Sequence, residues 1–345
     1  MFTRPRARLI CLSAVFIMFL SFGVVRAQHE TTGGGVMGGG PVGGSTGRTP
    51  ARTVTKPSTR TPTRKPTVTT SPATVRKPTT TTKPPVTSTT VNRGPDASAF
   101  IAAGDTQYDA KNYDAALEAY QKAVDLDPSL TRGHFRIGWI YNDQKNYDDA
   151  VASLKRALKL APNDSVIHNE IAYSLDNLGR TTEAIEEYQE AIRLDPKSGL
   201  AHIGLADVYK EKTKQIPEAI KLYVEGIRLR PNSYTAMYNL GWCYNDVDRY
   251  NDAIQVLREA VRIESDYPAA HNELGYSYHS LRRYPEAIQE YQTAIRQSSD
   301  YALAHYNLGL TYKAIGNRNL AMDQYRVLQR IDKDRAEKLL NQINK

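Results

Sequence analysis

The chain has 345 residues and a formal net charge of +8. The charge is unevenly placed, because residues 1–95 carry +13 and residues 96–345 carry −5. The basic character therefore belongs to the N-terminal segment, and it gives no support for nucleic-acid binding by the rest of the chain.

The first 27 residues have the order of a secretory signal peptide. Three arginines precede the apolar run 9–25, and a small-residue cleavage site ends at Ala27. We predict cleavage after Ala27 and export to the periplasm or the extracellular space. The alternative is an uncleaved helix over residues 9–25 that anchors the chain in a membrane. After cleavage Cys243 has no cysteine partner, so we expect no internal disulfide.

Residues 28–95 are predicted to form a disordered linker, glycine-rich at first and then rich in Thr, Pro, Lys and Arg. With few large aliphatic side chains, the segment cannot offset its chain entropy by burial. Two patterns in it resemble catalytic motifs, G-x-G-x-x-G at 33–38 and G-x-S-x-G at 43–47. Both motifs need a strand before and a helix after them, which this composition does not predict, so we reject both. The linker is either a spacer or a polybasic arm for an acidic partner.

From residue 97 onward the chain repeats with a period of 34 residues, in units that start at 97, 131, 165, 199, 234, 268 and 302. The fourth unit has one extra residue, within 211–217. Position 8 is always Gly or Ala, position 20 is always Ala, and position 24 is always Tyr or Leu. Positions 4, 7, 8 and 11 share one face of a first helix, and positions 20, 24 and 27 share one face of a second. Such a hairpin buries its apolar face only against neighbouring hairpins.

This pattern resembles the tetratricopeptide repeat (TPR) family over residues 96–335. The resemblance implies an all-α fold, a right-handed superhelical solenoid of antiparallel helix hairpins with a concave groove. Residues 336–345 place apolar side chains on one face, as expected for a C-terminal capping helix. The predicted order is therefore a signal peptide (1–27), a linker (28–95), seven repeats (96–335) and a capping helix (336–345).

Position 4 of five repeats is a histidine: His134, His168, His202, His271 and His305. A metal site needs several ligand atoms within about 2 Å of one ion. Equivalent positions on stacked hairpins lie roughly 8–10 Å apart or more, because helices cannot pack closer. We therefore predict that these histidines are structural, and that the chain has no metal site, cofactor or catalytic residue.

The opposite stripe of each first helix, at positions 2, 5, 9 and 12, is the surface that the TPR family places in the concave groove. We predict that a partner binds there through aromatic residues at positions 5 and 9 and acids at position 13, namely Phe135, Trp139, Tyr173, Tyr238, Trp242, Tyr276, Tyr306, Asp143 and Asp246. Exposed aromatic side chains are favoured contact residues. Two other interpretations stay open: the aromatic rings pack against the first helix of the adjacent repeat, and the acids are solvated helix ends.

An acidic, aromatic groove suits an extended basic or proline-rich peptide. Residues 48–93 have this composition, and one hypothesis is that they occupy the groove, in cis or in a neighbouring molecule. TPR domains that hold acidic chaperone tails carry Lys at position 5 and Asn at position 9. No unit of this chain has either residue there, so the resemblance does not imply that class of partner.

These observations predict a non-enzymatic, exported scaffold that binds a protein or peptide in its groove. No nucleic acid is expected, and a membrane is expected only if residues 9–25 stay as an anchor. Two alternatives are an envelope or pilus assembly factor and a protein whose aromatic groove binds glycans. Asn163-Asp164-Ser165 matches a glycosylation sequon and also a helix N-cap, and we favour the N-cap.

Overall fold

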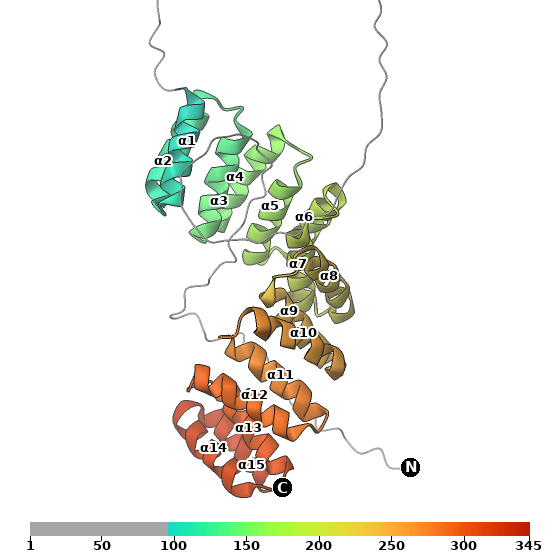
Figure 1. Ribbon diagram of the computed structural model, residues 1–345. Helices are drawn as coiled ribbons and strands as arrows, with labels where there is room; N and C mark the ends of the chain where they lie inside the picture. Colours follow the sequence, from blue (N-terminus) through green and yellow to red (C-terminus); the bar gives the residue numbers. More distant parts are fainter. Residues whose placement is uncertain (1–95) are drawn as a thin grey trace, which may run out of the picture. The chain divides into compact units, whose positions relative to one another are not determined.

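The computed structural model describes residues 96–345, and this part of the chain is helical, without a strand. The predictions about the signal peptide, the linker and its place in the groove lie outside the described residues. The helices form hairpins that follow one another in chain order, with one more helix after the last hairpin (Figure 1). The first helices of the hairpins are α1 (Ala97–Asp109), α3 (Thr131–Asp143), α5 (Ser165–Asn177), α7 (Gly199–Val208), α9 (Tyr234–Asp246), α11 (Pro268–Ser280) and α13 (Ala302–Ala314). The second helices are α2 (Tyr113–Leu126), α4 (Tyr147–Leu160), α6 (Thr181–Leu194), α8 (Ile216–Leu229), α10 (Tyr250–Ile263), α12 (Tyr284–Gln297) and α14 (Arg318–Ile331).

Each hairpin turns through one residue with a left-handed backbone, at φ between 57° and 78°. Only two of these residues are glycines, in the set Lys111, Lys145, Gly179, Lys214, Asp248, Arg282 and Gly316. The left-handed region costs a non-glycine residue about 1 kcal/mol or more, because its Cβ crowds the backbone. The repeated turn therefore carries backbone strain in five of the seven hairpins.

Replacing Lys111 by glycine is expected to stabilise the protein by about 0.5–1 kcal/mol. The gain is the relieved strain minus the larger entropy that glycine loses on folding. The matched control is Lys122→Gly in the interior of α2, which we expect to cost about 1 kcal/mol. Denaturant unfolding followed by circular dichroism measures both changes. A Lys111→Gly variant that is less stable than the wild type would contradict the strain argument.

The core of each hairpin joins a small residue on the first helix to a large one on the second. The side chains of Tyr120 and Leu154 are fully buried, at 0% exposure. A Cβ added to Gly138 would lie 2.6 Å from Leu154 Cγ, and one added to Gly104 would lie 2.5 Å from the Tyr120 ring. The predicted pairing of positions 8 and 24 is thus confirmed for these hairpins, because the glycine makes room for the larger side chain.

Successive first helices lie closer to each other than successive second helices do. α3 contacts α5, α5 contacts α7, α9 contacts α11, and α11 contacts α13, in addition to the contacts within each hairpin. The surface formed by the first helices is therefore the inner face of the solenoid, and we use the name inner face for it below.

The extra residue of the fourth repeat forms a π-helical turn at Tyr209–Thr213, directly after α7. The turn ends at Lys214, the left-handed residue that starts the path into α8. One residue is absorbed without moving the next hairpin out of the stack, as is typical of π-bulges. The turn also leaves the side chain of Lys210 buried beside α9.

The last helix, α15 (Lys333–Ile343), packs against α13 and α14. Asp332 caps its first turn, since its carboxylate accepts a hydrogen bond from the Arg335 amide at 3.0 Å. Ala336, Leu339 and Ile343 are buried, so this helix covers the apolar end of the seventh hairpin. It begins at Lys333, three residues before the predicted start at 336, because Asp332 supplies an N-cap there.

Candidate functional site

The inner face carries all nine residues predicted to bind a partner, but the surroundings of these residues differ. Asp246 is exposed, whereas Asp143 is partly buried and accepts a hydrogen bond from the Tyr108 hydroxyl at 2.8 Å. The other residues that keep partial exposure are Phe135, Tyr173, Tyr238, Trp242, Tyr276 and Tyr306. Trp139 is the exception.

Trp139 is buried, with 6% of its surface exposed. Its ring lies 5.6 Å from the Tyr108 ring on α1 and 5.7 Å from the Phe135 ring on its own helix. The Arg136 guanidinium lies over the same ring, 4.9 Å from its centroid. The ring of Trp139 therefore packs against the first helix of the adjacent repeat, which is one of the two alternatives to partner binding.

Trp242 occupies the same repeat position on α9 and stays partly exposed. The ammonium of Lys210 lies 5.5 Å from its ring centroid. Tyr238 packs on Tyr267 at 5.1 Å between ring centroids. Together with the exposed Asp246, these side chains form an aromatic and acidic surface that a partner can reach.

Tyrosines on α5 and α11 also pack against other aromatic rings. Tyr173 lies edge-on to Tyr147 at 6.2 Å, and Tyr276 lies edge-on to Tyr250 at 6.2 Å. In both cases a tyrosine of one hairpin contacts the first residue of the preceding second helix. Tyr306 on α13 is partly buried, and this burial raises the pKa of its hydroxyl.

The position-4 histidines join each first helix to its surroundings, as predicted. The Nδ1 atoms of His168 and His271 lie 2.6 and 2.7 Å from carboxylates on the second helix of the same hairpin. The Nε2 atom of His168 lies 3.2 Å from the Pro162 carbonyl, and that of His134 lies 3.1 Å from the Pro128 carbonyl. These contacts tie the loop before the hairpin to the first helix.

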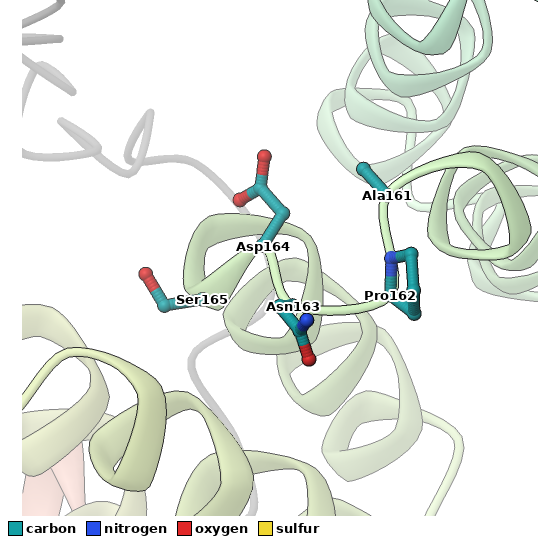
Figure 2. Close-up of a pocket in the computed structure, with 5 residues that line it drawn as sticks. All are labelled: Ala161, Pro162, Asn163, Asp164 and Ser165. Atoms are coloured by element: carbon teal, nitrogen blue, oxygen red, sulfur yellow. The ribbon is translucent and has the colours of Figure 1, made fainter.

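The loop 161–165 lies at the start of α5, and Figure 2 shows its side chains spread around a shallow surface depression. The Asp164 carboxylate accepts hydrogen bonds from the amides of Val166 and Ile167 at 2.9 and 3.3 Å. This confirms the predicted N-cap. The depression is lined by one loop alone and brings together no chemistry from other elements.

A buried polar network between neighbouring first helices was not predicted from the sequence. Asn142 Nδ2 donates to Glu170 Oε2 at 3.2 Å, and the Ser174 hydroxyl lies 2.7 Å from Asn142 Oδ1. The same arrangement recurs further along, where the amide of Asn245 donates to Glu273 at 3.0 Å. Ser277 completes the second network, with its hydroxyl 2.7 Å from Asn245 Oδ1.

The signal for these networks is a second, longer repeat in the sequence. GWIYND (138–143) returns as GWCYND (241–246), and HNE (168–170) returns as HNE (271–273). Both pairs are separated by 103 residues, as in 139 to 242, which is three repeats with the extra residue. A comparison of the chain with itself at this offset would have predicted the shared networks.

Burial controls the titration of the acids in this region. Burial raises the pKa of Glu273, and the hydrogen bonds from Asn245 and Asn272 oppose the shift. Burial also raises the pKa of Asp207 on α7 to about 6, although the Tyr223 hydroxyl and the nearby Lys210 lower it. The charges of neighbouring acids add to the rise. Loss of contact with water therefore destabilises the ionised form of both carboxyls.

Cys243 on α9 is the one cysteine in the described residues, and its side chain is buried. Burial raises the pKa of its thiol to about 12, so the nucleophilic thiolate is strongly disfavoured. Within residues 96–345, no group of three or more His, Cys, Asp or Glu side chains has an arrangement that could hold a metal ion. In the same range no helix has the length and apolar character to span a bilayer.

Comparisons with known proteins agree with this architecture. Three models of the tetratricopeptide repeat match the chain, together over more than half of its length, at residues 96–165, 177–213, 243–282, 276–316 and 302–335. A search of curated protein sequences found no match.

Many solved structures are similar in fold. The structure of PilF from Pseudomonas aeruginosa is 19% identical and has a TM-score of 0.55, covering 63% of this chain and 98% of that one. PilW, described as a widely conserved type IV pilus biogenesis factor, is 18% identical with a TM-score of 0.54, covering 61% and 98%. YrrB, described as a TPR protein with an unusual peptide-binding site, is 22% identical with a TM-score of 0.50, covering 55% and 97%. At these identities the likeness concerns the fold alone.

Proposed function

Because the chain belongs to the tetratricopeptide repeat family, we propose that it is a non-enzymatic interaction scaffold that binds an extended peptide or protein segment on its inner face. The observation that supports this function most directly is the accessible aromatic surface of α9, α11 and α13. Tyr238, Trp242, Tyr276 and Tyr306 all keep partial exposure there. Partly exposed tyrosine and tryptophan side chains provide contact area at a low cost in side-chain entropy.

The charge of residues 96–345 supports a basic partner. This part of the chain carries −5, and two of its acids are exposed, Asp246 at the end of α9 and Glu211 in the π-helical turn after α7. Complementary charge speeds the encounter between partners and selects among them. The proposed partner is therefore a basic, extended segment.

We also propose export, from the signal-peptide pattern of residues 1–27. In that setting a second candidate function is a role in envelope or pilus assembly. The structures of PilF and PilW, which share this fold over almost their whole length, favour that candidate.

The proposal predicts that binding needs the inner aromatic side chains and tolerates changes on the second helices. The full chain is immobilised and exposed to envelope extract, and bound protein and polysaccharide are analysed separately. We expect the Tyr238→Ala/Tyr306→Ala variant to lose at least about 90% of the protein that the wild type retains, since such contact residues carry most of the binding energy.

The matched control is Leu126→Ala/Val224→Ala, which removes exposed apolar side chains from α2 and α8. We expect this variant to retain the same protein as the wild type. Equal losses in both variants would contradict an inner-face site. Retention of polysaccharide in place of protein would instead support the glycan-binding alternative.

A further inference from the structure

The long repeat makes each half of the solenoid a template for the other. Helices α1–α6 correspond to α7–α12, at an offset of 102 residues from α1 to α7 and of 103 residues from α2 onward. Helix α13 starts a third copy, 103 residues after α7. The hydrogen bonds of the two buried networks agree to within a few tenths of an ångström. A hydrogen bond that is present in one copy and absent from the other therefore identifies a polar group without its donor or acceptor.

The first difference concerns the polar side chains at two matched contacts, that of α5 with α7 and that of α11 with α13. On α11, Asn272 Oδ1 accepts a hydrogen bond from the Asn307 amide of α13 at 3.0 Å. About two turns further on, His279 Nδ1 lies 2.9 Å from the Thr311 hydroxyl of α13. Both polar groups of α11 thus have a partner on the next helix.

The equivalent groups on α5 lack these partners. The residues of α7 that correspond to Asn307 and Thr311 are Gly204 and Val208, which offer no side-chain donor. Asn169 Oδ1, on a side chain that is 8% exposed, and Asp176 Oδ1 have no hydrogen bond. The nearest ammonium to Asp176, that of Lys212, is 3.9 Å away. Buried acceptors without a donor are rare in folded proteins.

The second difference concerns an aspartate. Asp105 on α1 pairs with two guanidinium groups of α3, from Arg132 at 2.5 Å and Arg136 at 3.2 Å. Its equivalent on α7 is Asp207. The arginines correspond to Thr235 and Asn239 on α9, so Asp207 receives a neutral amide, from Asn239 at 3.0 Å.

The charges around Asp207 do not cancel. Asp176 and Glu211 lie near enough to raise its pKa, and Lys210 lies near enough to lower it. The Lys210 ammonium is engaged elsewhere, at 2.7 Å from Asn239 Oδ1 and 3.3 Å from Glu211. With Lys212 beside Asp176, the three acids Asp176, Asp207 and Glu211 outnumber the two lysines 210 and 212 where α5, α7 and α9 meet.

We propose that this place on the inner face, bounded by Asn169, Asp176 and Asp207, is a subsite for the guanidinium or ammonium group of an arginine or lysine in an extended basic peptide. The inference rests on the proposed function and names the chemistry of one contact within it. The cation takes the position at Asp207 that Arg132 takes at Asp105, because Asn239 already fills the place of Arg136 and Thr235 carries no charge. Its N–H groups supply the donors that α7 lacks toward α5.

The corresponding place between α11 and α13 cannot accept a cation in this way. Asn307 already donates to Asn272, His279 stands where α5 has Asp176 and pairs with Thr311, and Leu310 stands where α7 has Asp207. Of these two matched places, the one between α5 and α7 alone offers such a subsite, and the second copy supplies a matched control within the same molecule.

The experiment measures binding of a fluorescent peptide with the sequence STRTPTRKPT, which residues 58–67 of the chain provide, to the full chain by anisotropy at low salt. In the control peptide, citrulline replaces arginine and norleucine replaces lysine, which removes the charge and keeps the length. We expect the charged peptide to bind at least about ten times more tightly than the neutral one, because buried and partly buried charge pairs dominate such contacts.

Three variants separate a binding role from a structural one. Asn239→Arg restores the arginine of the first copy, and we expect it to raise the melting temperature and weaken peptide binding about tenfold or more. Asn169→Ala is expected to weaken binding and to cost less stability than the matched change at Asn272, since the Asn169 carbonyl makes no hydrogen bond in the free chain. Asn272→Ala, at the matched position, is expected to lower the melting temperature and leave binding unchanged.

Several results would overturn the inference. These are absence of binding by the wild type up to about 1 mM peptide, equal binding of the charged and neutral peptides, and equal effects of Asn169→Ala and Asn272→Ala. If the partner captured from extract depends on Tyr238 and Tyr306 and is indifferent to Asn239→Arg, the subsite is wrong while the proposed function stands. If the Tyr238→Ala/Tyr306→Ala variant also captures the partner as well as the wild type does, the proposed function is wrong too.

Discussion

Combining Gly138→Ala with Leu154→Ala is expected to cost less stability than the two single changes added together. Leu154→Ala alone removes a fully buried side chain and should cost about 3–4 kcal/mol. Gly138→Ala alone forces a Cβ to within 2.6 Å of Leu154 Cγ and 3.2 Å of the Ala150 carbonyl, and should cost about 1–3 kcal/mol. In the double variant the new methyl group enters space that the leucine has left.

We expect the coupling between the two positions to be about 1 kcal/mol or more in favour of the double variant, as for residues in direct contact. Urea unfolding of the full chain, followed by circular dichroism, gives all four stabilities. Ala152→Val, on the exposed side of α4, is the control and should cost no more than about 0.7 kcal/mol, the difference in helix propensity between alanine and valine. Additive effects would show that positions 8 and 24 do not share one space.

The second large effect concerns pH. Asp207→Asn is expected to stabilise the protein at neutral pH relative to the wild type, by up to about 3 kcal/mol. The folded-state pKa of Asp207 is about 6, above its ordinary value of 3.8. The unfolded chain therefore loses the proton first as pH rises, and the wild type loses stability between pH ~4 and pH ~6. The gain stays below this limit because the side chain keeps some contact with solvent, which screens its charge.

Stability of the wild type and of Asp207→Asn is compared from pH 4 to pH 8. The difference between them should grow through the lower half of this range and become constant above pH ~7. Asp246→Asn, which removes an exposed acid from the neighbouring first helix, is the control for a general effect of charge, and an equal trend in both variants would contradict the assignment to Asp207. A pH-independent difference for Asp207→Asn would mean that the carboxyl titrates alike in the folded and unfolded chain.

The hairpin architecture was predictable because it depends on residues close in sequence. The period of 34, the small residues at position 8 and the apolar face of the last helix each specify contacts within one hairpin or with its neighbour. The extra residue within 211–217 was also located from the repeat alignment. Its form, a π-helical turn at 209–213, was not, because the alignment shows an added residue without its backbone geometry.

The solvent exposure of individual groove side chains was much less predictable. Trp139 and Trp242 have the same repeat position, yet the first is buried and the second is partly exposed. Arg136 lies over Trp139, whereas the corresponding residue on α9 is Asn239. The exposure of each ring thus depends on a residue three positions earlier and on the preceding first helix, and the repeat position alone specifies neither.

The unpaired groups on α5 depend on still more distant residues. Asn169 and Asn272 share their sequence neighbourhood, HNE in both cases. They differ in hydrogen bonding because residue 204 is glycine and residue 307 is asparagine, each 35 residues further along the chain. Only the packing of α7 on α5 identifies which substitution leaves an acceptor without a donor.

The most direct test of the account is to find where a basic peptide contacts the full chain. A photoreactive residue is placed beside the second arginine of STRTPTRKPT, and the cross-linked residues are identified by mass spectrometry. The account predicts cross-links on the inner face of α5, α7 and α9, within a few residues of Asp176, Asp207 or Asn239, and their loss in Asn239→Arg. Cross-links confined to α2, α4, α6 and α8, or unchanged in Asn239→Arg, would contradict it.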